Sequence, residues 1–401
     1  MLMPFKLVFK NTFLILVFFC FTTLSSCKAQ NKSVNKEILV AANRTNNYLP
    51  LIKKFKIGVV ANQTSVIFKK DGHTHLIDSL LKLNIKVNKV FSPEHGFRGK
   101  ADAAEHVASG VDSKTGLPII SLYGKHKKPT TEDLQNLELM IFDIQDVGVR
   151  FYTYISTLHY VMEACAENNI PLIVFDRPNP NGHYVDGPML NPKHSSFVGK
   201  HPVPLVYGMT IGEYAKMING EKWLKNGIQC DLKVIELENY THQSTYHLPI
   251  KPSPNLPNDK AINLYPSLGF FEGTPINAGR GTEYQFQQYG SALFPKTDFS
   301  YTPHPNEGSK HPKDENKLCY GVDLKTTLYL NKVNIEWLVD AYQKYPNKEK
   351  FFGATFTIHA GDTILEHQLK KGFTAKKIEE SWQSEIEKFK LIRTKYLLYS
   401  L

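Results

Sequence analysis

The chain has 401 residues, of which 42% are hydrophobic and 21% are charged. This composition, with 24 Phe and 20 Tyr, is typical of a globular protein with a large core and excludes an intrinsically disordered chain. The net charge is +10, but the basic residues are spread along the chain without a long basic block. We therefore expect no nucleic-acid partner, because nucleic-acid-binding surfaces cluster their basic residues.

The N-terminus predicts an exported lipoprotein. A short apolar stretch at 13–24 follows two lysines and ends in LSSC (24–27). The stretch is too short to span a bilayer easily, and a small-residue cleavage site directly before a cysteine resembles a bacterial lipobox. We expect a signal peptide at 1–26, a lipid on Cys27 and a polar tether at 27–37. The lipid would anchor the protein to a membrane of the bacterial cell envelope, at the periplasmic face of the outer membrane. An ordinary signal peptide with a chance cysteine is the alternative.

The next part of the chain alternates strand-like and helix-like patterns. Apolar stretches predict strands at 56–61, 87–91, 118–122, 137–143 and 171–176. Helical spacing and capping signals predict helices at 75–83, 131–137 and 152–168. Apolar strands that alternate with helices are typical of a mainly parallel sheet covered on both faces. We therefore expect an α/β protein with a Rossmann-like catalytic domain at 38–200.

From residue 201 onward the pattern becomes that of a smaller α+β auxiliary domain, 201–401. Thr210 and Glu213 form a capping box, which predicts a helix at 210–224. The remaining expected elements are a strand at 231–237, a loop-rich stretch at 248–316, and helices at 334–345 and 375–399.

Polar clusters follow all five strands predicted in the first domain. Ligands of open α/β sheets bind beyond the carboxyl ends of the strands, so these clusters predict a shared active-site rim. Ordinary turn chemistry is the alternative. The candidate residues are Asn62 after the first strand, Glu94, His95 and Arg98 after the second, Asp143, Asp146 and Arg150 after the fourth, and Asp176 and Arg177 after the fifth.

Several common sites are absent from the sequence. There is no G-x-G-x-x-G after the first strand, and no Walker A, G-x-S-x-G or H-E-x-x-H motif. His95 and His106 stand beside Glu94 and Glu105, but their spacing matches no common metal template. We expect no metal and no other cofactor; a metal-dependent hydrolase that uses His95 and His106 is an alternative.

The remaining chemistry is that of carboxyl groups. Hydrolysis of a glycosidic bond needs one protonated carboxyl group, and usually a second group that stabilises or attacks the positively charged sugar. Glu94 suits the acid role because it follows a rigid proline at a strand end, where partial burial favours the protonated form. A helix-terminal acid or an ion pair with Arg98 is the alternative. Candidates for the second group are Asp143, Asp146, Asp176 and Glu272.

A second cluster places Glu272, Arg280 and Glu283 among glycines and small residues. Four of the six arginines of the chain lie in these clusters: Arg98, Arg150, Arg177 and Arg280. A guanidinium fork at a sugar site suggests a carboxylate on the ligand. Among bacterial envelope sugars, N-acetylmuramic acid carries one on its lactyl ether, so we expect at least one of these arginines to bind it. Ion pairs that hold the strand-end loops are the alternative.

These segments together resemble the exo-β-N-acetylmuramidase family known as NamZ. The motifs are SPEHGFRG (92–99), FDIQDVGVRFYTY (142–154), FDRPNPNG (175–182), PSPNLP (252–257) and LYPSLGFFEGTPINAGRGTE (264–283). The resemblance implies a Rossmann-like domain and an auxiliary domain with the site in the cleft between them. It implies release of N-acetylmuramic acid from the non-reducing end of peptidoglycan fragments, with Glu94 as the catalytic glutamate.

The family motifs also add Tyr152 to the candidate substrate-binding residues. The resemblance implies peptidoglycan-derived muropeptides or disaccharides as partners. The run TPINAGRGTEYQFQ (274–287) departs from the family pattern, which affects the expected substrate preference. A noncatalytic muropeptide-binding lipoprotein that uses the same cleft is the alternative from a different functional class.

Overall fold

A computed structural model of the chain describes residues 36–97 and 109–401. The expected signal peptide, Cys27 and Arg98 lie outside the described residues. Residues 38–401 form one compact unit. Within the described ranges, no helix has the length and apolar character needed to cross a membrane.

The described residues form a seven-stranded sheet in the order β5-β6-β4-β1-β7-β8-β9. All neighbouring strands pair in parallel except β5 and β6, which are antiparallel. Counted along the chain, the six parallel strands run in the order 3-2-1-4-5-6, which is that of the Rossmann fold. The predicted Rossmann-like sheet is thus confirmed. The strands are β1 (Ile57–Ala61), β4 (Val87–Ser92), β5 (Gly110–Val111), β6 (Pro118–Ser121), β7 (Leu139–Asp143), β8 (Leu172–Phe175) and β9 (Leu232–Ile235).

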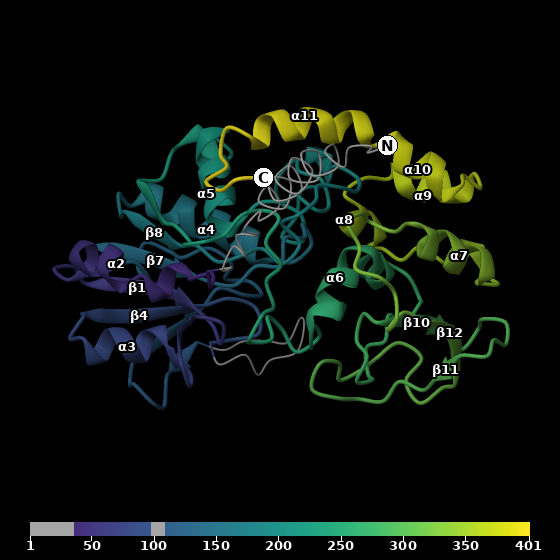
Figure 1. Cartoon of the computed structure of the whole chain (residues 1–401), viewed down its shortest axis with the longest axis horizontal. Coiled ribbons are helices and arrows are strands. Elements are labelled where there is room, and N and C mark those ends of the chain that lie inside the picture. The colour runs from purple at the N-terminus through teal and green to yellow at the C-terminus, as the bar shows by residue number, and fades with distance from the viewer. Residues whose placement is uncertain (1–35, 98–108) are drawn as a thin grey trace, which may run out of the picture. The chain divides into compact units, whose positions relative to one another are not determined.

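Helices cover both faces of this sheet, as Figure 1 shows. Successive strand residues point to opposite faces, so Val60 and Phe142 join one core cluster while Val59 and Ile141 join the other. Apolar residues of α4 and α5 pack in the first cluster, and those of α2 and α3 pack in the second. The helices are α2 (Thr45–Ile52), α3 (Leu76–Lys82), α4 (Tyr154–Glu167) and α5 (Ile211–Gly220).

The described residues after β9 form a smaller antiparallel and helical part, the C-terminal part. Its three-stranded sheet has the order β10-β12-β11. A separate hairpin, β2 with β3, follows β1. The strands are β2 (Val66–Lys69), β3 (Gly72–His75), β10 (Gln288–Ser291), β11 (Ser300–Tyr301) and β12 (Cys319–Asp323). The helices are α6 (Asp259–Leu268), α7 (Glu336–Lys344), α8 (Phe356–Ala360), α9 (Ile364–Lys370), α10 (Ala375–Ser381) and α11 (Gln383–Arg393).

Several expected elements differ in the structure. The helix predicted at 131–137 is wrong, because this segment forms turns. The helix predicted at 375–399 is two helices, α10 and α11, separated at Trp382, whose buried Nε1–H donates to Asp186 at 2.9 Å. The stretch expected to be mostly loop contains α6, capped by the Asn258 side chain. Strand β9 joins the large sheet although it follows residue 200; the domain division at that residue stays a prediction.

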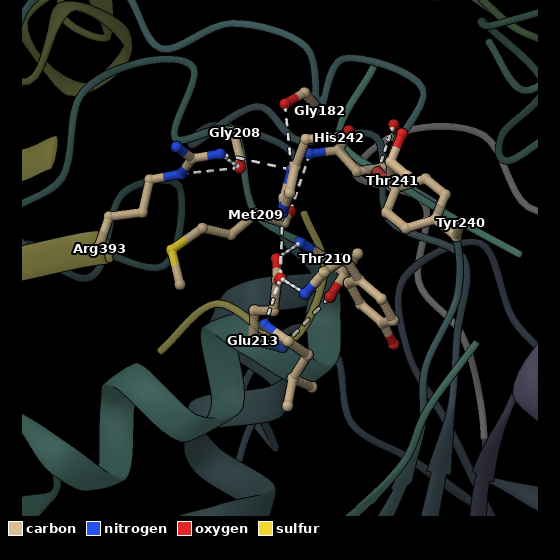
Figure 2. Close-up of polar contacts among 12 residues, drawn as sticks. Gly182, Gly208, Met209, Thr210, Glu213, Tyr240, Thr241, His242 and Arg393 are labelled. Atoms are coloured by element: carbon tan, nitrogen blue, oxygen red, sulfur yellow. Dashed lines mark hydrogen bonds and ion pairs between the residues drawn. The ribbon is translucent and has the colours of Figure 1, made fainter. Parts of the chain in front are cut away.

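A buried polar network ties the C-terminal segment to the large sheet's helix α5 (Figure 2). Glu213 completes the predicted capping box with Thr210. The other carboxylate oxygen of Glu213 accepts hydrogen bonds from His242 Nε2 at 3.0 Å and from the Leu398 backbone N–H at 2.8 Å. Arg393 Nη2 lies 3.3 Å from His242 Nδ1. His242 Nδ1 also lies 3.3 Å from the Gly182 carbonyl, so the ring contacts Glu213, Arg393 and Gly182 together. The network therefore stabilises α11 and the chain end against α5.

A histidine pair lies buried between α4 and the loop before α5. His159 Nδ1 is 2.9 Å from His201 Nε2, and His159 Nε2 is 3.6 Å from the Glu163 carboxylate. Burial, together with the positive charges of Lys200 and Lys128, lowers the pKa of His159 from 6.5 to about 4, although Glu163 opposes this shift. Burial also lowers the pKa of His201 well below 6.5. Both rings are therefore neutral in the folded protein at neutral pH.

This pair predicts a loss of stability in acid. Between pH 6.5 and about 4 the unfolded His159 binds a proton that the folded one does not, so stability falls as the pH falls, by about 2–3 kcal/mol over the window. The variant His159→Gln should lose less stability over this range than the wild type. Chemical denaturation at several pH values measures both slopes. Equal slopes in the two proteins would show that His159 makes no such contribution.

Candidate active site

A cavity of about 290 Å³ lies at the carboxyl ends of the large sheet's strands, between the sheet and the C-terminal part. From the sheet side it is lined by Glu94, His95, Tyr123, Phe151, Tyr152, Thr153, Tyr154, Phe197 and Val198. From the other side it is lined by Ser253, Asn255, Leu256, Tyr265, Glu272, Arg280, Phe286 and His359. Two of the predicted carboxyl groups, Glu94 and Glu272, thus come to one cavity from opposite walls.

Glu94 stands in a tight turn just after β4. The Gly96 N–H donates to the Pro93 carbonyl at 3.1 Å, and His95 adopts a φ of +70° inside the turn. Glycine or asparagine is usual at such a position, and a buried histidine there costs conformational energy that functional sites commonly retain. Thr153 Oγ1 donates to Glu94 Oε2 at 2.6 Å. The turn and this hydrogen bond fix the carboxyl group at the cavity wall.

Asn62, the predicted residue after β1, contacts a tyrosine of the cavity lining. It is fully buried, and its Nδ2 donates to the Tyr154 hydroxyl at 3.0 Å. Tyr154 lines the cavity and its hydroxyl lies 3.5 Å from the Glu94 carbonyl. The neighbouring Tyr152 hydroxyl donates to the Pro252 carbonyl at 2.8 Å, which joins the sheet side to the segment behind the opposite wall. Asn62 is therefore a positioning residue.

Glu272 is held by cations. Arg280 Nη1 lies 3.3 and 3.2 Å from the two carboxylate oxygens, and the half-buried Lys313 lies close by, where it donates to the Glu272 carbonyl at 3.2 Å. Burial acts to raise the pKa of Glu272, but the positive charges of Arg280 and Lys313 outweigh it, so the pKa is lowered. The Glu272 side chain is 26% exposed and remains an accessible carboxylate anion.

His359, on α8, is a cavity residue that sequence reasoning missed. Its Nδ1 lies 2.9 Å from the Thr355 carbonyl, to which it donates, and its ring packs against Phe151 at 5.7 Å between centroids. Burial lowers its pKa, so the ring is neutral and Nε2 is a hydrogen-bond acceptor. No motif precedes this residue, and only the packing of α8 brings it to the cavity.

Other predicted residues form a scaffold beneath the cavity. Arg177 and Asp143 make a fully buried bidentate ion pair, with Nε to Oδ1 at 2.6 Å and Nη2 to Oδ2 at 2.9 Å. Asp146 accepts the Gly148 N–H at 2.7 Å and the Tyr207 hydroxyl, and burial raises its pKa to about 6. None of these three charged residues lines the cavity.

Arg150 and Asp176 are also buried away from the cavity. Arg150 donates to four backbone carbonyls, those of Pro188, Val203, His359 and Ala360, at 2.6–3.1 Å. Burial lowers the Arg150 pKa to about 9. Asp176 accepts four hydrogen bonds, from Thr210, Gly212, Arg177 and Tyr399, and burial raises its pKa to about 7. Glu283 is exposed and does not line the cavity.

The structure thus brings together five predicted site residues: Glu94, His95, Tyr152, Glu272 and Arg280. The other described candidates bind to neighbouring groups inside the fold, except Glu283, which is exposed. Among the residues that the structure describes, no group of three or more His, Cys, Asp or Glu side chains is arranged to hold a metal ion. His106, the second histidine of the metal alternative, lies outside those residues.

Comparison with known proteins agrees with this arrangement over nearly the whole chain. Residues 57–260 match the N-terminal domain of exo-beta-N-acetylmuramidase NamZ, and residues 263–399 match its C-terminal domain. The chain is 37% identical over 384 residues to the peptidoglycan beta-N-acetylmuramidase NamZ of Bacillus subtilis, covering 88% of this chain and 89% of that protein.

Two solved structures from Bacteroides fragilis, both of DUF1343 family proteins, share the fold. One has a TM-score of 0.84 at 43% identity and covers 91% of this chain and 99% of its own. The other has a TM-score of 0.76 at 26% identity, covering 90% and 99%. With both domains matched in order, and with two glutamates facing one cavity, the chain belongs to the NamZ family of exo-β-N-acetylmuramidases, glycoside hydrolases formerly known as DUF1343 proteins.

Proposed function

We propose that this protein hydrolyses the β-glycosidic bond of an N-acetylmuramic acid residue at the non-reducing end of peptidoglycan fragments. The observation that carries the proposal is the meeting of Glu94 and Glu272 in a cavity of about 290 Å³. Small-molecule sites usually have about 300–1,000 Å³, so this cavity suits a single sugar residue better than a long stretch of chain. Removal of one terminal residue at a time agrees with that size.

The two glutamates suit different steps of the hydrolysis. Glu94, held by Thr153, donates a proton to the glycosidic oxygen as the bond to the anomeric carbon breaks. Glu272 is kept ionised by Arg280 and Lys313, and its negative charge stabilises the positive charge that develops on the sugar ring. Water supplies the hydroxyl group of the released sugar, and its remaining proton restores the acid.

Analysis of the products tests this function. The purified protein and the disaccharide N-acetylmuramic acid–β-1,4–N-acetylglucosamine should give the two free monosaccharides. A fragment that begins with N-acetylglucosamine at its non-reducing end is the matched control and should stay intact. Cleavage inside long glycan chains, without release of the terminal sugar, would contradict the exo-acting proposal.

We also propose that Arg280 binds the lactyl carboxylate. Among the arginines that the structure describes, it alone lines the cavity, whereas Arg150 and Arg177 bind the scaffold. Arg280→Lys keeps the charge but loses the fork, so we expect kcat/KM on a muraminide to fall about 10-fold or more, and selectivity over the glucosaminide to narrow. Arg150→Lys and Arg177→Lys are the controls; they should lower the melting temperature and leave selectivity unchanged. An unchanged selectivity ratio for Arg280→Lys would exclude the clamp.

Anchoring through Cys27 is a further part of the proposal, supported by the LSSC sequence at 24–27. A lipoprotein on the periplasmic face of the outer membrane would meet peptidoglycan fragments where they arise. Cys27→Ser should move the protein from the membrane fraction to a soluble or uncleaved form, because the acyl chains provide the membrane affinity. Mass spectrometry of the mature N-terminus checks the result. Membrane partition and N-terminal mass equal to those of the wild type would contradict the anchor.

A further inference from the structure

An aromatic strip leads out of the cavity on the sheet side. We define it as Tyr123, Phe197 and Tyr160, three half-buried rings from three separate segments. Tyr123 and Phe197 line the cavity, and their ring centroids are 6.2 Å apart. Phe197 also stacks nearly parallel to Tyr160, at 16° and 6.3 Å, and Tyr160 does not line the cavity. Phe197 therefore connects the cavity to a surface beyond it.

Two lysines stand over this strip. Lys127 Nζ is 4.8 Å from the Phe197 ring centroid, and Lys200 Nζ is 4.8 Å from that of Tyr160 and donates to its hydroxyl at 3.2 Å. Within the described chain, neither ammonium group forms an ion pair with a carboxylate. The aromatic faces hold both cations at fixed positions without neutralising them. This surface is thus apolar, cationic and continuous with the cavity.

We propose that the aromatic strip and its two lysines bind the leaving-group side of the substrate, so that the enzyme acts best on glycan fragments longer than a disaccharide. This inference rests on the proposed function. A cavity that holds one terminal sugar must open where the rest of the chain leaves it, and Phe197 is a cavity residue from which the surface continues outward. Pyranose rings carry apolar C–H faces that pack on aromatic rings.

The lysines define the chemistry of the preferred fragment. In a chain of alternating sugars, the second sugar after the cleaved bond is again N-acetylmuramic acid, which carries a lactyl carboxylate or an acidic peptide. Such an anion would complement Lys127 and Lys200, which have no carboxylate partner in the described protein. The disaccharide lacks this sugar, so it has no anion at the position of the two lysines. The lysines therefore act on substrate length, whereas Glu94 and Glu272 act on the bond itself.

The test compares kcat/KM on the disaccharide with that on the tetrasaccharide of the same repeat. The wild type should prefer the tetrasaccharide, and the double variant Lys127→Gln/Lys200→Gln should lose about 3- to 10-fold on the tetrasaccharide with the disaccharide unchanged. Raising the salt concentration should reduce the preference of the wild type in the same way. Lys376→Gln, at an exposed lysine on α10, is the matched control and should change neither rate. Phe197→Leu should lower kcat/KM on the tetrasaccharide. Its melting temperature shows whether the variant is folded.

The outcomes separate this inference from the proposed function. If the wild type cleaves both substrates at equal kcat/KM, or if the double lysine variant keeps the tetrasaccharide rate, the strip does not bind the leaving group, although the glycosidase activity stands. If the wild type cleaves neither substrate, the proposed function itself is contradicted. Arginine at both lysine positions keeps the charge and should retain the tetrasaccharide preference.

Discussion

Replacing Glu94 with glutamine is expected to lower kcat on an unactivated disaccharide about 10²- to 10⁴-fold, because the amide keeps the shape of the side chain but has no transferable proton. Thr153 can still hydrogen-bond to the amide oxygen, as it does to Glu94 Oε2, so the turn after β4 should keep its structure. Binding of N-acetylmuramic acid, measured by calorimetry, should remain within a few-fold of the wild type.

Glu283→Gln is the matched control, because Glu283 is an exposed glutamate outside the cavity lining and its loss should leave turnover unchanged. Near-wild-type turnover by Glu94→Gln would exclude Glu94 as the acid. Binding without turnover by the wild type would instead favour the noncatalytic muropeptide-binding alternative.

Replacing Asp143 with asparagine is expected to lower the free energy of unfolding by about 3–5 kcal/mol, because it leaves the Arg177 guanidinium buried without its counter-charge. Both side chains are almost fully excluded from solvent. Glu366→Gln is the matched control: it breaks the Lys370–Glu366 pair on α9, which is much more exposed and should contribute at most about 1 kcal/mol. Denaturation in urea measures both changes.

The same variant separates a scaffold role from a catalytic one. If Asp143 only supports the strand ends, the Asp143→Asn variant, assayed at a low temperature where it is folded, should have a kcat within a few-fold of the wild type. A variant that kept the wild-type stability but lost turnover would place Asp143 among the catalytic groups instead.

Most of the large sheet could be predicted from the sequence because six of its strands are short apolar stretches, whereas β5, two exposed residues, carries no such signal. The capping box at Thr210 and Glu213 could also be predicted, because both residues lie within one helical turn, and the structure confirms it. Helix α6 was not predicted because Pro266 lies within it and prolines and asparagines surround it, although Asn258 before Asp259 is a capping signal. The segment at 131–137 has a helical start without enough apolar residues to pack a helix.

The site was harder to predict because the partner of a charged side chain is a property of the fold. Asp143 and Glu94 both follow strands, yet one meets Arg177 in the core and the other faces the cavity. His359 comes from a five-residue helix that carries no motif, and only tertiary packing brings it to the site. Sequence patterns therefore pointed to the strand ends, and packing decided which residues line the cavity.

The most direct test of the account is turnover of a chromogenic β-N-acetylmuraminide by the purified protein, with the matching β-N-acetylglucosaminide measured alongside. The two substrates differ only in the lactyl ether, so their rates report both the glycosidase chemistry and the recognition of the carboxylate. We predict release of the chromophore from the muraminide and much slower release from the glucosaminide. No release from either substrate, or equal kcat/KM on both, would contradict the account.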